Sequence, residues 1–176
     1  MPRQSFEEAM LPHLDAAFNY ARWLTRSDAD AEDVVQDAYM RALKFFSSFR
    51  GENAHSWLLT IVRNTWYGRF QKRASPLRIV PTTETVEEPA DVALDPEALL
   101  MQRQTVARVR HLLEELPADF REVLVLRELE GLSYKEIATV VGIPIGTVMS
   151  RLARARERLM AAMTASSTSG GDRAVR

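Results

Sequence analysis

The stretch Gly131–Leu159, GLSYKEIATVVGIPIGTVMSRLARARERL, is the most informative part of this chain of 176 residues. Ser133 can cap a first helix, and Glu136 three residues later completes a capping box. Gly142 predicts the end of that helix, because glycine accepts the positive φ of a tight turn. Pro144 suits the start of a second helix, where its missing N–H has no intrahelical partner. The stretch therefore predicts a helix-turn-helix, the motif that places its second helix in a DNA major groove.

The predicted second helix has one apolar stripe and a basic surface around it. At about 100° per residue, the stripe contains Val148, Leu152, Ala155 and Leu159. The opposite side contains Ser150, Ala153 and Glu157, flanked by Met149 and Arg154, with Arg151 and Arg158 on one shoulder and Arg156 on the other. Arginines on both shoulders suit phosphates on either side of a groove. A solvated basic helix in an ordinary bundle is the alternative, but four arginines in eight residues favour DNA binding.

Composition limits the classes of protein to which the chain can belong. The formal net charge is −1, which is low for a free DNA-binding protein, so we expect a partner to supply part of the affinity. The chain has no cysteine, and its three histidines have no metal-ligand spacing, so we expect neither a metal nor a cofactor. No apolar run approaches the length of a membrane span and no signal peptide is recognisable, so we expect a cytoplasmic location without membrane insertion.

Two helices are predicted near the amino terminus. Residues 6–24 have the spacing of one amphipathic helix, and Ser27 can cap the next. The second helix has an apolar stripe and an acidic face that contains Glu32, Asp33, Gln36 and Asp37. Acids in a first turn complement the helix dipole, worth about 0.3–1 kcal/mol each. That explanation does not reach Asp37, two turns in, so a docking surface for a basic partner is a second interpretation.

A third helix, predicted from Ala54 to Arg73, mixes aromatic and basic residues. Leu58, Ile61, Val62 and Thr65 are expected to face inward, while Trp57, Trp66, Tyr67 and Phe70 exceed what one core stripe requires. Arg63, Arg69, Lys72 and Arg73 lie among them, with no acidic residue in the helix. Rings between cations suit single-stranded nucleic acid, whose bases stack on aromatic side chains. The alternative is that the rings belong to the core.

The periodicity stops between Ala74 and Asp95, where three prolines and five acids predict a flexible acidic linker or a simple solvated spacer. Helical patterns resume after Pro96, and the segment from Thr164 is rich in Ser, Thr and Gly. We therefore predict an all-α protein with two small helical domains. The predicted ranges are 6–73 for the first domain, 74–95 for the linker, 96–163 for the domain with the helix-turn-helix, and 164–176 for a disordered tail.

Three blocks in this order resemble the diagnostic blocks of bacterial RNA polymerase sigma factors. They are Asp30–Lys44 (DAEDVVQDAYMRALK), Phe49–Asn64 (FRGENAHSWLLTIVRN) and Leu132–Arg158. With no domain between them, the chain resembles the small two-domain extracytoplasmic-function (ECF) group. That resemblance implies a chain that binds core RNA polymerase, directs it to the minus-35 and minus-10 promoter elements and promotes melting. It also implies an anti-sigma factor as a partner.

The resemblance implies a role for each matching position. Asp33, Gln36, Asp37 and Arg41 would dock on the β′ clamp helices of core polymerase. Phe49, Arg50, Trp57, Arg63, Asn64, Tyr67, Lys72 and Arg73 would contact minus-10 DNA, with Asn64 at an extruded base of the non-template strand. Lys135, Thr147, Met149, Ser150, Arg151, Ala153, Arg154, Arg156 and Arg158 would contact minus-35 duplex, and this domain would also meet the β flap. Met149 replaces the Arg or Lys of many relatives, and Ala153 offers only a methyl group, suited to thymine.

The predicted linker agrees with the span that such a protein must cover. The centres of the two promoter elements lie about 20–25 base pairs apart, or roughly 70–85 Å. Twenty-two linker residues reach at most about 70 Å when fully extended. The linker would pass through the nucleic-acid channel of the polymerase.

Two other classes of protein would require different features in the sequence. A regulator that binds operators as a dimer would have a ligand-binding or dimerisation domain in place of an acidic docking helix and an aromatic, basic helix. An enzyme would need a phosphate loop, metal spacing or a nucleophile–base pair, none of which is identifiable by motif. We therefore expect that the chain is not an enzyme.

Overall fold

All the regular elements that the structure describes are helices, as the predicted all-α class requires. The computed structural model describes residues 5–51, 53–73 and 95–169, and their side chains over 5–51, 53–70 and 95–166. Residues 74–94 of the predicted linker lie outside these ranges, as do residues 170–176 of the predicted tail.

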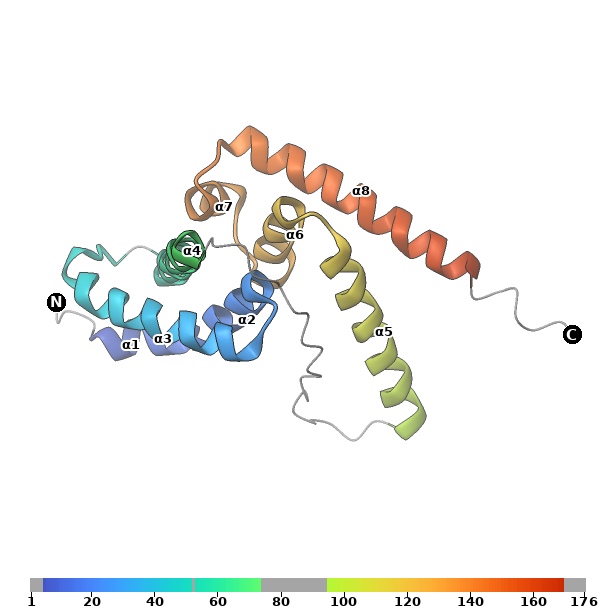
Figure 1. Cartoon of the computed structure of the whole chain (residues 1–176), viewed down its shortest axis with the longest axis horizontal. Helices are drawn as coiled ribbons and strands as arrows, with labels where there is room; N and C mark the ends of the chain where they lie inside the picture. The colour runs from blue at the N-terminus through green and yellow to red at the C-terminus, as the bar shows by residue number, and fades with distance from the viewer. Residues whose placement is uncertain (1–4, 52, 74–94, 170–176) are drawn as a thin grey trace, which may run out of the picture.

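The first domain is a bundle of α2, α3 and α4, preceded by a short helix (Figure 1). Its elements are α1 (Phe6–Met10), η1 (Leu11–His13), α2 (Leu14–Thr25), α3 (Asp28–Phe45), η2 (Phe46–Ser48) and α4 (Ala54–Arg73). One helix was predicted over residues 6–24, but the structure divides it. Pro12 lies in the 3₁₀ turn of η1, where its missing N–H interrupts the α-helical hydrogen bonds. Ser27 caps α3 as predicted, since its hydroxyl accepts from the Asp30 N–H.

The second domain contains the predicted helix-turn-helix. Its elements are α5 (Pro96–Glu115), α6 (Ala118–Leu124), the π-helical turn η3 (Val125–Leu129), α7 (Tyr134–Val141) and α8 (Ile145–Ser169). The capping box of Ser133 and Glu136 is complete, and Gly142 ends α7 with a φ of 73°. The predicted stripe of α8 faces inward: Val148, Leu152 and Ala155 are buried and Leu159 is half-buried.

The carboxyl-terminal helix is longer than the predicted domain. Residues 164–169, which were assigned to the tail, continue α8. The stretch Met160–Ala165 explains the extension, because alanine and methionine have high helix propensity and no glycine or proline intervenes.

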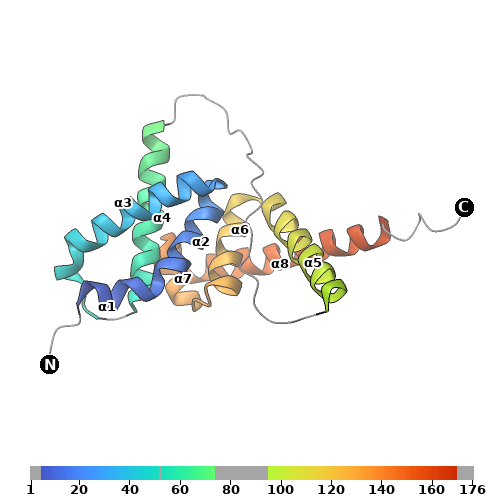
Figure 2. The same cartoon turned by 90° about the horizontal axis from the view of Figure 1, so that it is seen from below.

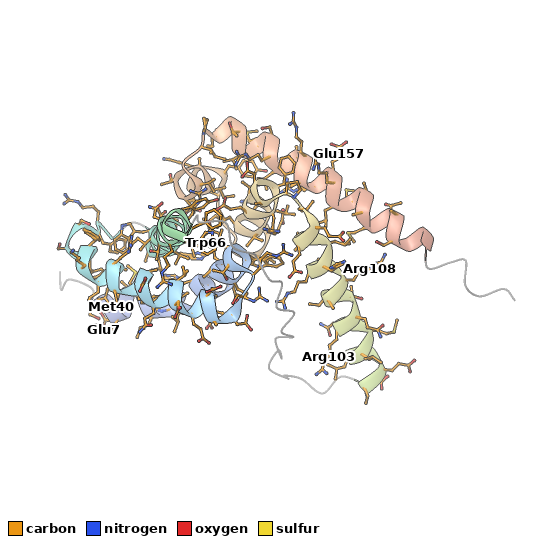
Figure 3. All side chains as sticks on the ribbon, in the orientation of Figure 1. Glu7, Met40, Trp66, Arg103, Arg108 and Glu157 are labelled. Atoms are coloured by element: carbon orange, nitrogen blue, oxygen red, sulfur yellow. The ribbon has the colours of Figure 1, made fainter. Side chains whose placement is uncertain are left out.

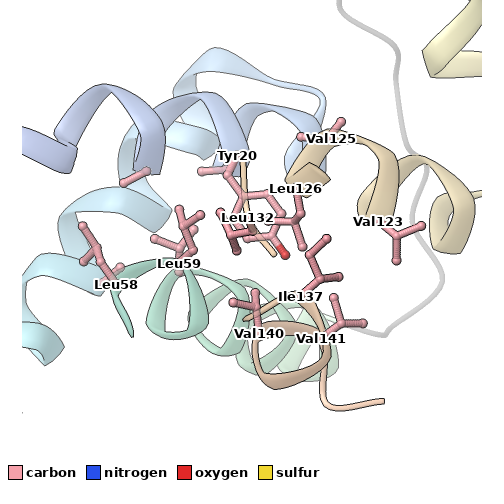
Figure 4. Close-up of a cluster of buried hydrophobic side chains, with 14 of the residues drawn as sticks. Tyr20, Leu58, Leu59, Val123, Val125, Leu126, Leu132, Ile137, Val140 and Val141 are labelled. Atoms are coloured by element: carbon pink, nitrogen blue, oxygen red, sulfur yellow. The ribbon is translucent and has the colours of Figure 1, made fainter. Parts of the chain in front are cut away.

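The two domains pack directly on each other. In Figures 1 and 2, α4 lies beside α7, and α2 lies near α6 and the turn that follows it. Tyr20 of α2 and Leu59 of α4 share one cluster with Leu126, Leu132 and Ile137 of the second domain (Figure 4). All five side chains are fully buried or nearly so. The buried residues of both domains therefore form one continuous hydrophobic core.

The described residues contain neither a single membrane-spanning helix nor a cluster of metal-ligating side chains. No single described helix is long and apolar enough to cross a membrane, although α7 and α8, bent by 102°, pass that test when joined. Within the same residues, no group of three or more His, Cys, Asp or Glu side chains is placed to hold a metal ion.

Candidate nucleic-acid interface

Glu122 of α6 is the buried polar centre of the contact between the two domains. Its side chain is 4% exposed, and it accepts three hydrogen bonds from the first domain. Arg63 of α4 donates from Nε to Oε1 at 2.8 Å and from Nη2 to Oε2 at 3.4 Å. The Tyr20 hydroxyl of α2 donates to Oε1 at 2.7 Å. Three helices from two domains thus meet at one carboxylate.

The surroundings of this carboxylate fix the protonation of its two donors. Burial raises the pKa of Tyr20 well above its usual value, and the charge of Glu122 raises it further. For Arg63, burial alone would lower the pKa, but the hydrogen bond and the charge of Glu122 outweigh burial and raise it. Both groups therefore keep their protons, and the Arg63 guanidinium also lies 4.3 Å from the ring centroid of Tyr67.

The other described cation in the middle of α4 is bound by the acidic face of α3. Arg69 donates to Asp37 Oδ2 at 2.8 Å from Nε and at 2.5 Å from Nη2. Its Nη1 lies 3.8 Å from a carboxylate oxygen of Asp33. The helix dipole could not account for Asp37, and this ion pair within the domain gives a structural reason for that acid. Gln36 and Arg41, also predicted to face core polymerase, are exposed on the same helix.

The remaining predicted minus-10 residues are distributed around α4. Asn64 is exposed, and Tyr67 is 37% exposed. Trp57 is half-buried, and its ring centroid lies 5.0 Å from that of Phe49. Arg50 is exposed in the turn before α4, whereas the side chains of Lys72 and Arg73 lie outside the described residues. Trp57 therefore serves the core in part, as the alternative interpretation held, and Phe49 packs against the core beside it.

The shoulders of α8 face neighbouring elements of its own domain. Arg151 Nη2 lies 3.1 Å from Asp119 Oδ2, and the Arg158 guanidinium lies 4.8 Å from the Phe120 ring centroid. On the other shoulder, Arg156 binds Glu128 at 2.7 Å, and this hydrogen bond raises the pKa of Arg156. The arginines therefore lie on two sides of α8, and one side contacts α6 while the other contacts η3.

The centre of α8 is open to solvent. Met149, Ser150, Ala153 and Arg154 are exposed, as is Lys135 on α7, while Thr147 is half-buried. Glu157 on α8 is also exposed, whereas Trp66 on α4 is half-buried (Figure 3). Arg154 has no ion pair or hydrogen bond with the described part of the chain.

The two predicted DNA surfaces lie close together. Arg63 binds Glu122 and Arg151 binds Asp119, and these two acids are three residues apart on α6. Three residues along an α-helix correspond to a rise of about 4.5 Å. The charges of Asp119 and Arg151 even affect the pKa of Tyr67 on α4, which is raised mainly by burial.

Further polar contacts join the domains at their edges. The Asn53 side-chain amide hydrogen-bonds Glu136 of α7. His55 Nε2 lies 3.3 Å from a carboxylate oxygen of Glu130, and the His55 ring stacks on His13 with centroids 5.2 Å apart. The Asn53 and His55 contacts therefore pair the start of the first domain's α4 region with the second domain.

Sequence reasoning did not identify Glu122 and Tyr20. The signal for Glu122 was present, because the acid directly precedes the apolar run Val123–Leu126. A charged residue at such a position is buried only when it is paired. Its partners come from residues 59 and 102 positions away in the chain, and no local pattern predicts such pairs.

Comparison with known proteins supports the interpretation of both domains. Residues 10–75 match the family description "Sigma-70 region 2", and residues 107–159 match "Sigma-70, region 4". The RNA polymerase sigma-H factor of Pseudomonas aeruginosa is 39% identical over 140 residues, 74% of this chain and 71% of that protein. The ECF RNA polymerase sigma-E factor of Escherichia coli K12 is 40% identical over 137 residues, 74% of this chain and 72% of that protein.

Solved structures agree with the sequence matches. The sigma factor RpoE of Bartonella quintana, solved with the anti-sigma factor NepR, aligns with a TM-score of 0.72 and 31% identity. That alignment covers 90% of this chain and 96% of the other. CnrH, solved with the cytosolic domain of CnrY, aligns with a TM-score of 0.62 and 28% identity over 91% of this chain and 88% of the other.

The fold and both matched regions define a transcription initiation factor of the sigma-70 class. Within that class, the chain belongs to the extracytoplasmic-function sigma factors, which direct RNA polymerase to promoters.

Proposed function

We propose that the free form of this sigma factor is closed, and that core polymerase separates the two domains before both promoter elements are read. The observation that supports this is the attachment of Arg63 and Arg151 to acids three residues apart on α6. Promoter elements whose centres lie roughly 70–85 Å apart cannot both be contacted by residues held so near each other.

In this proposal the residues keep the roles that the family resemblance implies. The α3 surface with Asp33, Gln36, Asp37 and Arg41 contacts the β′ clamp helices. The α4 surface contacts melted minus-10 DNA, with Asn64 at an extruded base, and α8 contacts minus-35 duplex. The chain acts by binding alone, since nucleotide addition belongs to polymerase, and it acts in the cytoplasm, where polymerase meets the promoter.

An anti-sigma factor is part of the proposal. RpoE was solved with the anti-sigma factor NepR, and CnrH with the cytosolic domain of CnrY. By similarity, we infer that this chain has such a partner, which would act by holding the closed arrangement. A ligand can favour one of two conformations only through a difference in its affinity for them.

A pair of spin labels tests the closed form directly. The chain has no cysteine, so Ser47→Cys on η2 and Ala161→Cys on α8, both exposed, give one label on each domain. We expect a single narrow distance distribution in free protein, which defines the closed form, and a longer distance after core polymerase is added. The same distance in both samples would refute the opening.

A minimal transcription assay tests the activity itself. The chain with core polymerase should start transcripts at one promoter class, and core polymerase alone should not. Protection of a palindromic operator without polymerase would support the dimeric regulator instead.

A further inference from the structure

A small hollow lies between the domains, away from the predicted promoter contacts. It forms where the end of α2 meets α5 and α6, three helices that converge near the centre of Figure 1. Arg22 and Arg26 line it from the first domain, and Arg110 and Arg121 line it from the second. Glu114 is the only carboxylate among the residues that line this hollow. None of these arginines was predicted to contact DNA or polymerase.

The positive charge of the hollow is only partly compensated. Arg22 is paired with Asp28, and Arg26 Nη2 lies 3.9 Å from Glu114 Oε2, a long ion pair. Arg121 Nη1 donates to main-chain carbonyls, at 2.9 Å to Glu114 and 3.5 Å to Leu116.

Arg110 forms no hydrogen bond or ion pair with any residue that the structure describes. The four guanidinium groups therefore have two carboxylate partners, Asp28 and Glu114. The charge of Glu122 also acts on Arg121, but Glu122 is compensated by Arg63, so two positive charges remain in excess.

The arginines oppose each other across the domain boundary. Burial lowers the pKa of Arg121, and the positive charge of Arg26 lowers it further. Arg26 belongs to the first domain and Arg121 to the second, so closing the two domains brings like charges together. An anion between them would remove that repulsion.

The size and donor set of the hollow indicate the chemical class of that anion. Guanidinium groups bind phosphate oxygens through paired N–H donors. The hollow is open to solvent, and its volume of about 30 Å³ can take the oxygens of one charged group while the rest of a ligand stays outside. We propose that this interdomain arginine site binds a phosphate group of a small phosphorylated molecule and thereby stabilises the closed arrangement.

The stabilisation follows from mass action. Separating the domains divides the site into Arg22 and Arg26 on one side and Arg110 and Arg121 on the other. An anion that needs both sides binds the closed form more tightly, so it shifts the equilibrium toward that form.

Titration calorimetry of the full chain with pyrophosphate tests the site. Arg110→Gln should weaken pyrophosphate binding about five- to tenfold, as expected for losing a charged hydrogen-bond donor. The matched control is Arg103→Gln, an exposed arginine two turns earlier on α5 (Figure 3), which should leave binding unchanged. Glu114→Gln should strengthen binding, because it removes the competing carboxylate.

The same titration contains the results that would overturn the proposal. No saturable binding of pyrophosphate at millimolar concentration would refute the site. Equal weakening by Arg110→Gln and Arg103→Gln would show attraction to overall charge, and weaker binding in Glu114→Gln would contradict the assigned geometry.

The link to closure is measured separately with the spin labels at residues 47 and 161. Pyrophosphate should increase the short-distance population more than potassium chloride does at equal ionic strength, and Arg110→Gln should reduce that increase. Equal effects of the two salts would refute the link. If core polymerase still opens the chain, failure here leaves the proposed sigma-factor function intact.

Discussion

The two helices predicted to meet DNA, α4 and α8, differ in what holds their cations. On α4, Arg63 is bound by Glu122 of the other domain and Arg69 by Asp37 of α3. On α8, the shoulder arginines are held within their own domain, but the central surface with Ser150, Ala153 and Arg154 is exposed. The helix predicted to read duplex DNA is therefore accessible in the closed chain, while the helix predicted to contact melted DNA is restrained by the domain that carries the partner of Arg63.

That difference suggests an order of events. To bind DNA, the predicted minus-35 surface must lose only exposed ion pairs such as Arg156–Glu128, whose disruption costs little free energy. To bind DNA, the predicted minus-10 surface must separate Arg63 from the buried carboxylate of Glu122, whose disruption costs more free energy. In the proposed mechanism, melting is thereby coupled to a domain separation that core polymerase drives.

The largest effect is expected from Glu122→Ala. The substitution leaves Arg63 and Tyr20 without their shared acceptor, so the closed arrangement should lose about 3–5 kcal/mol. The spin-label distance of the free chain should then shift to the long population. Glu128→Ala is the control, because it removes an ion pair whose carboxylate is 52% exposed and should cost at most about 1 kcal/mol. A closed population unchanged by Glu122→Ala would remove the distinction between α4 and α8.

Asn64→Ala tests whether the exposed part of α4 contacts DNA. We expect open-complex formation to slow about tenfold, within the 1–3 kcal/mol of a good base contact, while affinity for core polymerase is unchanged. Permanganate footprinting of melted promoter and a core-binding titration give the two readings. Gln102→Ala, at an exposed position on α5, is the control. Equal losses in both assays would contradict a specific role for Asn64.

Arg154→Ala tests the accessible surface of α8. Because Arg154 is exposed and unpaired within the described residues, its removal should not affect folding. Minus-35 protection should weaken about fivefold, and if the contact is to phosphate, the salt dependence of binding should fall by about one counterion. Unchanged protection of the minus-35 element would refute the contact.

The smallest effect is expected from His13, at the edge of the first domain. Burial lowers its pKa below 6.5, and the nearby charge of His55 lowers it further. The unfolded chain therefore binds a proton more readily, so stability is full above pH 6.5 and decreases as the pH falls through that value. Urea unfolding at pH 7.5 and 5.5 should show this loss, and His13→Gln should reduce it. An identical pH dependence in both proteins would contradict the assignment.

Local patterns in the sequence predicted most of the individual elements. The Ser133–Glu136 capping box, the turn at Gly142 and the buried stripe of α8 are confirmed. These features depend on residues three or four apart, for which helix geometry is nearly fixed. The two errors, at Pro12 and at residues 164–169, concern where helices break or end, which depends on small energies at their termini.

The helical class and the helix-turn-helix follow from the chain alone, because each is a periodic or local property of its residues. Tertiary packing alone pairs Glu122 with Arg63 and Tyr20, pairs Asp37 with Arg69, and brings four arginines together between the domains. Those pairings join residues distant in sequence. The residue type alone does not show whether a charged side chain is exposed or paired. The packing of the two domains therefore distinguishes an arginine that is free to meet DNA from one that is already bound.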